Sequence, residues 1–355
     1  MSKPLPLFPA SIVGSIPRPL VVRELIEKPQ WDAADTATMD AAIRFVVAMQ
    51  ERAGLDVVND GEWRRRSYIG VIAELAYGFT LETNPADGRP WTVVTEKLTP
   101  KPAGFIADEA AFVKKVATVA TKITLPAPAL LGERLWDAER SKKAYPARDD
   151  FVRACVAPLR TEIALLQGMG VDIVQIDDPH LCLFVDPDVR RRYDDPERAA
   201  DFAVEMINET VADFPGIKFA VHLCRRAGAR VRGEKHHAGT YGPILAQLNR
   251  LKVQHLTMEF TAAGADDLES LGRLREDFEI GLGVVDVTPG APEAAPVIAS
   301  RVERALSRID KGRITLNPDC GFAPGSSAKV DTDEVYLKLK AEADAARMLR
   351  AKYAE

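Results

Sequence analysis

His222 and Cys224 carry two of the side chains that proteins use most often to bind soft metal ions. They flank a single leucine just after the apolar run 219–221, where a strand is expected to end. Side chains two positions apart on a strand point to the same side, so the imidazole and the thiol would face one space. Their types indicate zinc rather than magnesium or calcium. The same spacing is also typical of a core cysteine beside a buried histidine.

The elements that would position this pair recur along the whole chain. Short β-branched runs, with amphipathic segments between them, occur at 11–15, 56–62, 122–128, 172–179, 219–224, 255–260, 280–286 and 313–321. Their nearly continuous apolar character is typical of strands buried on both faces of a parallel sheet. The helical segments include 36–55, 151–170 and 296–312, and each carries a glycine near its end that can cap a helix.

Eight strand–helix repeats favour a closed (β/α)8 barrel, the TIM barrel, over an open sheet. We therefore predict one α/β barrel over residues 1–355. The stretch 80–108 is long, proline-rich and weakly periodic. It is predicted to be an insertion after the second strand, forming a hairpin or lid near the barrel mouth.

Composition and charge limit the partners that the chain is expected to have. The net charge is −5, and no long basic run is present, so no nucleic-acid partner is expected. The sequence has no apolar run of about 18 residues and no leader pattern, so we expect a cytoplasmic protein without a membrane partner. Its 4 cysteines are expected to be reduced. The oligomeric state stays open, with a homo-oligomer among the options.

Chemistry in such barrels lies at the carboxyl ends of the strands, where the loops converge. Polar residues collect at these ends: Gly14-Ser15, Asp60-Gly61-Glu62, Asp177-Asp178, His222, Cys224, Glu259, Asp286 and Asp319-Cys320. A His/Cys/Cys set with one carboxylate matches a four-coordinate zinc site built from three strands.

Each of these residues also has a purely structural interpretation. Asp177 and Asp178 could cap the following helix, and Ser15 could make a turn. Glu62 could begin an exposed helix. The neighbours His236 and His237 resemble ligands, but adjacent loop residues point apart, so no second metal is expected.

The order of several motifs resembles the cobalamin-independent methionine synthase family. The motifs are SIVGSIPRP, DVVNDGEWRR, VQIDDP, HLC, TMEF, VVDV and LNPDCGF, which together span about residues 11–325. The similarity is strongest to short single-barrel relatives of that enzyme's catalytic domain, in the broader fold that uroporphyrinogen decarboxylase shares. The resemblance implies a zinc ion held by His222, Cys224 and Cys320, with Glu259 as a replaceable fourth ligand.

The resemblance also implies an activity and a substrate. A thiol such as homocysteine would bind as a thiolate and accept a methyl group. Gly14, Ser15, Glu62 and Asp177, with Asp178 beside it, would bind the amino acid through its carboxylate and ammonium. Glu62 and Asp286 are the expected catalytic carboxylates, with Asp286 handling a proton or supporting the metal site.

This chain departs from the large synthases at the positions used for the methyl donor. Thr288 stands where the family has a histidine, and Leu183 stands where it has a folate-binding glutamate. The family's Arg-Cys-Val segment has no counterpart in EKLTPKP, and the second barrel is missing. The identity of the methyl or alkyl donor is therefore open.

Two alternatives remain beside homocysteine methylation. The first keeps zinc but adds the thiol of coenzyme M to an epoxide. Coenzyme M has a sulfonate and no ammonium, so Glu62 and Asp177 would lack a cationic partner. The second is a barrel that binds zinc or a thiol without catalysis. A decarboxylase of the same broader fold would have no use for the His/Cys/Cys set.

Overall fold

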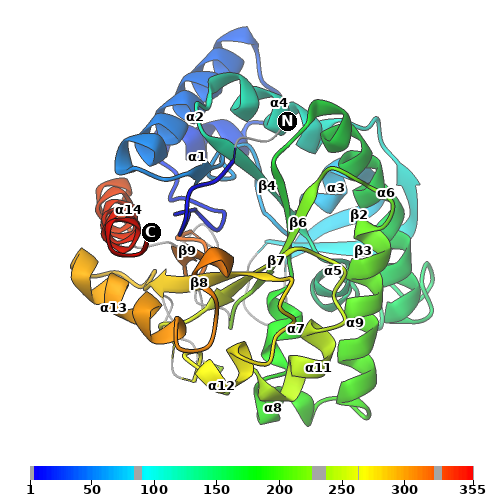
Figure 1. Ribbon diagram of the computed structural model, residues 1–355. Helices are drawn as coiled ribbons and strands as arrows, with labels where there is room; N and C mark the ends of the chain where they lie inside the picture. Colours follow the sequence, from blue (N-terminus) through cyan, green and yellow to red (C-terminus); the bar gives the residue numbers. More distant parts are fainter. Residues whose placement is uncertain (1–3, 84–89, 226–236, 263, 324–329, 355) are drawn as a thin grey trace.

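A parallel sheet of 7 strands forms the centre of the part of the chain that the structure describes (Figure 1). The structure is a computed structural model that describes residues 4–83, 90–225, 237–262, 264–323 and 330–354. The neighbouring strands of the sheet, in order, are β1 (Val57–Val58), β4 (Ala120–Pro126), β5 (Ile173–Asp177), β6 (Lys218–Leu223), β7 (His255–Glu259), β8 (Glu279–Val285) and β9 (Ile314–Pro318).

The N-terminal segment closes this sheet into a barrel. Ala10 forms a parallel bridge with Leu316 of β9, and Ser11 forms one with Val57 of β1. Ser11 N–H donates to the Leu316 carbonyl at 2.9 Å, which joins the first and last strands through this segment. The α/β barrel predicted from the sequence is confirmed.

The predicted first strand, 11–15, is wrong in its extent, because regular pairing stops at Ser11. The backbone beyond it is bonded elsewhere. The carbonyl of Val13 accepts from the Gln175 side chain at 3.1 Å, and that of Gly14 accepts from Asn59 Nδ2 at 3.1 Å. With these bonds, residues 12–15 are not paired to a neighbouring strand. Residues 13–15 line the cavity at the barrel mouth instead.

Helices surround the sheet on its outside (Figure 1). The longer ones are α1 (Leu20–Glu27), α2 (Ala33–Ala53), α4 (Phe105–Val116), α5 (Pro128–Leu135), α6 (Arg148–Met169), α9 (Pro196–Val211), α13 (Ala295–Ala305) and α14 (Thr332–Tyr353). Short turns are α3 (Ile72–Leu75), α7 (Pro179–Leu183), α8 (Pro187–Arg190), η1 (Gly242–Ile244), α11 (Leu245–Leu248), α12 (Leu268–Leu271) and η2 (Lys311–Arg313). Within the described residues, none of these helices has the length and apolar character needed to cross a bilayer.

Local sequence explains where the predicted helices begin and end. In α2, the Asp32 side chain accepts from the Asp35 N–H at 2.8 Å, and Gly54 ends the helix at φ 101°. Gly170 ends α6 at φ 64° in the same way. The third predicted helix, 296–312, is too long, because α13 ends at Ala305 and Leu306 is its C-cap. Gly312 lies instead in the separate turn η2.

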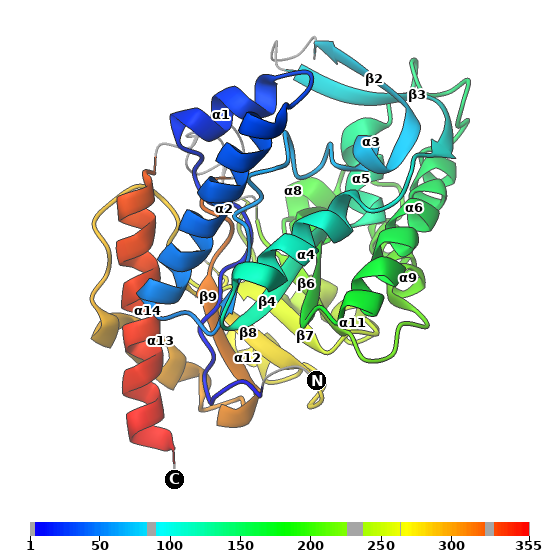
Figure 2. The ribbon, with the colours of Figure 1, turned by 90° about the horizontal axis from the view of Figure 1, so that it is seen from above.

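An antiparallel hairpin follows the first strand of the sheet and stands above the barrel (Figure 2). It consists of β2 (Ala76–Thr83) and β3 (Pro90–Pro100) and contacts α5 and α6. It begins before the insertion predicted at 80–108, and residues 105–108 already belong to α4. Residues 84–89 lie outside the described part of the chain.

Candidate metal centre

Three residues of metal-ligand type meet at the carboxyl end of the barrel. The ligand atoms of His222, Cys224 and Cys320 all lie within 4.8 Å of one another, and all three residues are buried. The sulfur atoms of Cys320 and Cys224 are 3.4 Å apart. The cysteines are free thiols. Residues from the carboxyl ends of β6 and β9 therefore form one group.

Strand geometry explains how these residues meet. His222 belongs to β6, and Cys224 follows the end of that strand, on the same side of the sheet. Cys320 comes just after β9, which closes the barrel against residues 10–11. Asp319, beside it, accepts hydrogen bonds from Phe260 N–H at 2.9 Å and Thr261 N–H at 3.1 Å, which tie the ends of β9 and β7 together.

The His222 ring is oriented by its hydrogen bond to a carboxylate. Nδ1 lies 3.1 Å from Asp177 Oδ1, and parallel pairing sets the two residues side by side on β5 and β6. Nε2 is buried and has no hydrogen-bond partner among the described residues. Buried polar atoms are nearly always satisfied, so an unpaired imidazole nitrogen beside two thiols fits a metal ligand. The residues present therefore fit a bound metal ion.

Electrostatics around the three residues describe the site without a metal ion. Burial alone would lower the pKa of His222, but Cys224 and Asp177 outweigh it and raise this pKa to about 10, so in the metal-free site both ring nitrogens carry a proton, and a metal ion at Nε2 would replace one of them. The contact with Cys224, together with burial, raises the pKa of the Cys320 thiol. These buried sulfur atoms therefore need a nearby cation before they can ionise at neutral pH.

Glu259, the predicted fourth ligand, lies outside this group of three. It is fully buried at the end of β7, and its Oε2 is 3.7 Å from Nη1 of Arg225. The Arg225 guanidinium stacks over the Tyr241 ring at 4.5 Å and donates to the Gly239 carbonyl at 2.8 Å. An arginine held this firmly attracts the Glu259 carboxylate. The role of Glu259 as a ligand stays a prediction.

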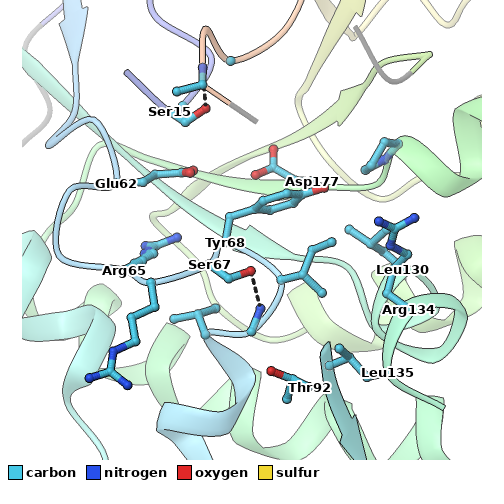
Figure 3. A pocket seen from close by; sticks show the side chains of 18 of the residues that line it. Ser15, Glu62, Arg65, Ser67, Tyr68, Thr92, Leu130, Arg134, Leu135 and Asp177 are labelled. Carbon is cyan, nitrogen blue, oxygen red and sulfur yellow. Dashed lines mark hydrogen bonds between the residues drawn. The ribbon is translucent and has the colours of Figure 1, made fainter. Parts of the chain in front are cut away.

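A cavity of about 1220 Å³ opens above the metal-ligand group. Besides the three ligand residues, its wall includes four predicted substrate residues: Gly14, Ser15, Glu62 and Asp177. Figure 3 shows Glu62 and Asp177 pointing toward one another across this space. The hairpin contributes residues of both β2 and β3 to the same wall. The sequence-predicted substrate and metal residues thus largely share one cavity.

Backbone conformation places the Glu62 side chain in the cavity. Gly61 and Glu62 both have left-handed φ values, 66° and 60°, and such a value in a non-glycine residue is strained. Arg18 Nη2 holds the turn by donating to the Glu62 carbonyl at 2.9 Å. Thr124 Oγ1 donates to Glu62 Oε1 at 2.7 Å. A Cβ at Gly14 would lie 2.8 Å from that oxygen, so a larger residue there would displace the Glu62 carboxylate.

Burial is the largest influence on the Glu62 carboxyl, and it raises its pKa. Arg65 opposes this shift, whereas the nearby Asp177 adds to it. A cation placed between Glu62 and Asp177 would relieve the repulsion between two carboxylates. The pair therefore has the electrostatics of a site for an ammonium group.

Ser15 connects the substrate side of the cavity to the loop of Cys320. Its carbonyl accepts from Phe322 N–H at 2.9 Å, and its Oγ accepts from Ala323 N–H at 3.3 Å. A Cβ at Gly321 would lie 2.3 Å from Ser15 Oγ, so this close approach needs a glycine. The predicted contact of Ser15 with a substrate carboxylate stays a prediction.

Two predicted residues lie away from the cavity wall of the described structure. Asp178 is fully buried and caps α7, accepting from Leu181 N–H at 2.8 Å. Burial raises the pKa of Asp178 to about 7. Asp286 follows β8, and its Oδ1 accepts from Thr288 N–H at 2.8 Å. Neither residue lines the cavity. The substrate role of Asp178 and the catalytic role of Asp286 remain untested predictions.

Sequence reasoning missed two residues near the metal-ligand group. Tyr68 lines the cavity, and its ring lies beside Asp177 (Figure 3). Burial raises the pKa of its hydroxyl, so Tyr68 stays a hydrogen-bond donor. Tyr68 lies in a loop, where the hydrophobic periodicity of helices and strands gives no indication of a site residue. Gln175 donates to Asp177 Oδ1 at 2.7 Å, and its position two residues earlier on the same strand face could have indicated this.

Other described histidines and cysteines have structural surroundings that explain them. His237 Nδ1 lies 2.8 Å from Asp186 Oδ2, whereas its neighbour His236 is outside the described residues. His255 opens β7 and pairs with Thr315 Oγ1 at 3.0 Å. The thiols of Cys155 and Cys182 are fully buried among apolar side chains.

His180 lines the cavity, and its lowered pKa predicts a stability that depends on pH. Burial lowers the pKa of His180 from 6.5 to about 4. An unfolded chain binds this proton as the pH falls through 6.5, whereas the folded chain does so only near 4. Stability should therefore fall by about 3 kcal/mol between these values, and thermal unfolding of the His180→Gln variant should lack this part of the decline. Unfolding curves with the same slope against pH in both proteins would contradict this.

Comparisons with known proteins agree with the fold and identify the family. Residues 8–348 match the family model for the catalytic domain of the cobalamin-independent synthase. Methionine synthase of Saccharolobus islandicus is 31% identical over 333 residues, which cover 91% of this chain and 90% of the relative. Methionine synthase of Sulfolobus acidocaldarius is 26% identical, with 91% and 88% covered.

Solved structures share the same architecture. A B12-independent methionine synthase from a Shewanella species, in complex with selenomethionine, has a TM-score of 0.80 at 21% identity and covers 98% of this chain and 99% of its own. A structure described as a putative enzyme of the same kind from Listeria monocytogenes has a TM-score of 0.73 at 21% identity, over 98% and 99%. Fold, site and sequence matches together define an α/β-barrel methyltransferase. The chain belongs to the cobalamin-independent methionine synthase family.

Proposed function

We propose that the protein transfers a methyl group to homocysteine, using a zinc site formed by His222, Cys224 and Cys320. One observation carries the proposal: the metal-ligand group and the facing carboxylates of Glu62 and Asp177 share a single cavity. The first supports a bound thiolate, and the second supports an amino-acid ammonium. Homocysteine contains both groups.

The donor set favours zinc over other metals. Two thiols and an imidazole nitrogen are ligands for zinc, whereas magnesium and calcium require oxygen ligands. When bound, the ion would supply a cation that lowers the pKa of a substrate thiol, so that its proton is lost to solvent and the thiolate stays available as a nucleophile at neutral pH. Such chemistry needs reduced cysteines, which fits the cytoplasmic location expected from the sequence.

The protein's own residues bind and orient the amino acid. Glu62 and Asp177 accept hydrogen bonds from its ammonium, and backbone N–H groups of Gly14 and Ser15, which line the same cavity, donate to its carboxylate. The ammonium restores the charged form of Glu62, whose pKa burial raises. Methyl transfer then forms the sulfur–carbon bond as the donor–carbon bond breaks, and the electron pair of the broken bond stays with the donor.

Glu62 contributes to catalysis by holding the ammonium. We propose that Asp286, which does not line the cavity, handles a proton or supports the metal site, because Thr288 cannot replace the histidine that the large synthases use. The size of the cavity admits a donor beside homocysteine. Its chemical class, folate, corrinoid or small methyl compound, is left to experiment.

The coenzyme M alternative fits the cavity less well. A sulfonate between Glu62 and Asp177 would meet two buried carboxyl groups and no cation. A barrel that merely binds a thiol would need no donor space beside the metal-ligand group. Homocysteine methylation is therefore the better supported activity.

The proposal is tested with purified, zinc-loaded protein. Zinc-edge X-ray absorption should gain one sulfur neighbour when homocysteine is added, and coenzyme M should leave the spectrum unchanged. Methionine should then form from homocysteine with one of the three donor classes, as measured by mass spectrometry. A spectrum that is unchanged by homocysteine but gains a sulfur neighbour with coenzyme M would favour thiol addition to an epoxide.

A further inference from the structure

A chain of buried hydrogen bonds runs through the barrel interior to His222. Lys122 Nζ of β4 donates to Gln175 Oε1 of β5 at 3.0 Å. Gln175 Nε2 donates to Asp177 Oδ1 at 2.7 Å, and His222 Nδ1 lies 3.1 Å from that same oxygen. The exposed fractions of Lys122 and Gln175 are 1% and 0%, so water does not compete for these bonds.

Lys122 sets the donor-to-acceptor order of these hydrogen bonds, because its ammonium can only donate. Gln175 must therefore present its oxygen to Lys122 and its nitrogen to the opposite side. One further contact requires the same orientation, and a second is compatible with it. Gln175 Nε2 donates to the Val13 carbonyl at 3.1 Å, and Thr257 Oγ1 donates to Gln175 Oε1 at 3.4 Å. The amide is thus held in one of its two orientations.

A fixed Gln175 amide determines how Asp177 meets His222. Asp177 Oδ1 accepts the Gln175 N–H and lies 3.1 Å from His222 Nδ1. An acceptor oxygen held in this place keeps a proton on Nδ1 and leaves Nε2 as the nitrogen that can bind a metal ion. The other nitrogen, Nε2, has no hydrogen-bond partner among the described residues and lies beside the two sulfur atoms.

The barrel interior compensates the Lys122 charge. Asp177 and Glu342 both attract it, and Glu342 Oε1 accepts from Ser11 N–H at 3.0 Å in the same interior. Burial lowers the pKa of Lys122 to about 8, so the side chain is still mostly charged at pH 7. A buried cation is costly unless such groups surround it, which argues that Lys122 is there for a purpose other than packing.

We infer that Lys122 and Gln175 are positioning residues that set the orientation and tautomer of His222, so that Nε2 is presented as a metal ligand. The inference rests on the proposed function, because it requires metal binding by His222. Lys122 and Gln175 would then influence metal affinity from the barrel interior, although they contact neither the metal nor the substrate.

Gln175→Glu tests this with almost no change in shape. An oxygen acceptor remains for Lys122, but the group facing Asp177 Oδ1 loses its N–H. Affinities for Zn²⁺ and Co²⁺ are measured by competition with a chromophoric chelator, and thermal unfolding is followed on the metal-free proteins. We expect metal affinity to fall by about 10- to 100-fold, the usual effect of losing a partner that supports a metal-binding histidine. Lys122→Met should act in the same direction, and it carries the test if the first variant does not fold.

Thr315→Val is the matched control. It removes the 3.0 Å contact with His255, which is also buried in the sheet but is not joined to His222. This control should lose stability and keep wild-type metal affinity. Unchanged affinity in Gln175→Glu and Lys122→Met, or an equal loss in the control, would overturn the inference. Failure of the wild-type protein to bind zinc would instead overturn the proposed function.

Discussion

Replacing Cys320 by serine should remove the metal and nearly abolish methyl transfer. The wild-type protein is expected to bind about one zinc ion per chain at the group formed by His222, Cys224 and Cys320. A serine hydroxyl does not ionise at neutral pH, so one of the anionic ligands is lost. Because even a partner that only supports a ligand costs about 10- to 100-fold in affinity, a direct ligand should cost more than about 100-fold.

Elemental analysis and a chelator competition measure the metal, and methionine formation measures the activity. Cys155→Ser is the matched control, since Cys155 is a fully buried thiol of α6 that does not contact the site. It should lower stability and keep zinc. His222→Ala should behave like Cys320→Ser. Zinc content that survives both ligand substitutions would refute the metal site.

Replacing Glu62 by glutamine should weaken homocysteine binding without releasing zinc. The substitution removes a buried charge, while the new side chain can still accept from Thr124, whose Oγ1 lies 2.7 Å from Glu62 Oε1. A hydrogen bond to a charged group is worth about 1.5–3 kcal/mol, which corresponds to roughly 10- to 150-fold in kcat/KM. Most of this effect should appear in KM, because the ammonium is distant from the reacting sulfur.

A thiol without the amino group separates this cause from general damage. Wild-type protein should prefer homocysteine over 4-mercaptobutyrate, its analogue that lacks the ammonium, and Glu62→Gln should reduce this preference strongly. The activity with 4-mercaptobutyrate should change little. An equal loss of activity with both thiols would show that Glu62 acts on something other than the ammonium.

The types of residue at the site were predictable because each strand ends in a local signal. A β-branched run followed by a polar residue marks a strand end in the sequence, and parallel strands of a barrel place these ends together. This reasoning brought His222, Cys224 and Cys320 into one group, which the structure describes within 4.8 Å. Glycines with local roles, such as Gly54 and Gly170, were also recognisable as the ends of helices.

Partners that meet only across the barrel were not predictable. Asp177 binds His222 from the neighbouring strand, and Glu259 meets Arg225, whose guanidinium is held by Tyr241. Sequence separation carries no information on which of two nearby groups a carboxylate will contact. That choice depends on distances of a few ångströms and on burial, which strengthens each charge interaction.

The sequence by itself therefore determined the barrel class, and it indicated which residues of metal-ligand type lie at the strand ends, since both depend on local periodicity and side-chain type. Only the tertiary structure decided that residues 10–11 close the sheet, that a hairpin borders the cavity, and that Lys122 and Gln175 stand behind His222. These features arise from hydrogen bonds between segments far apart in the chain. Their geometry exists only once the strands have closed around a common interior.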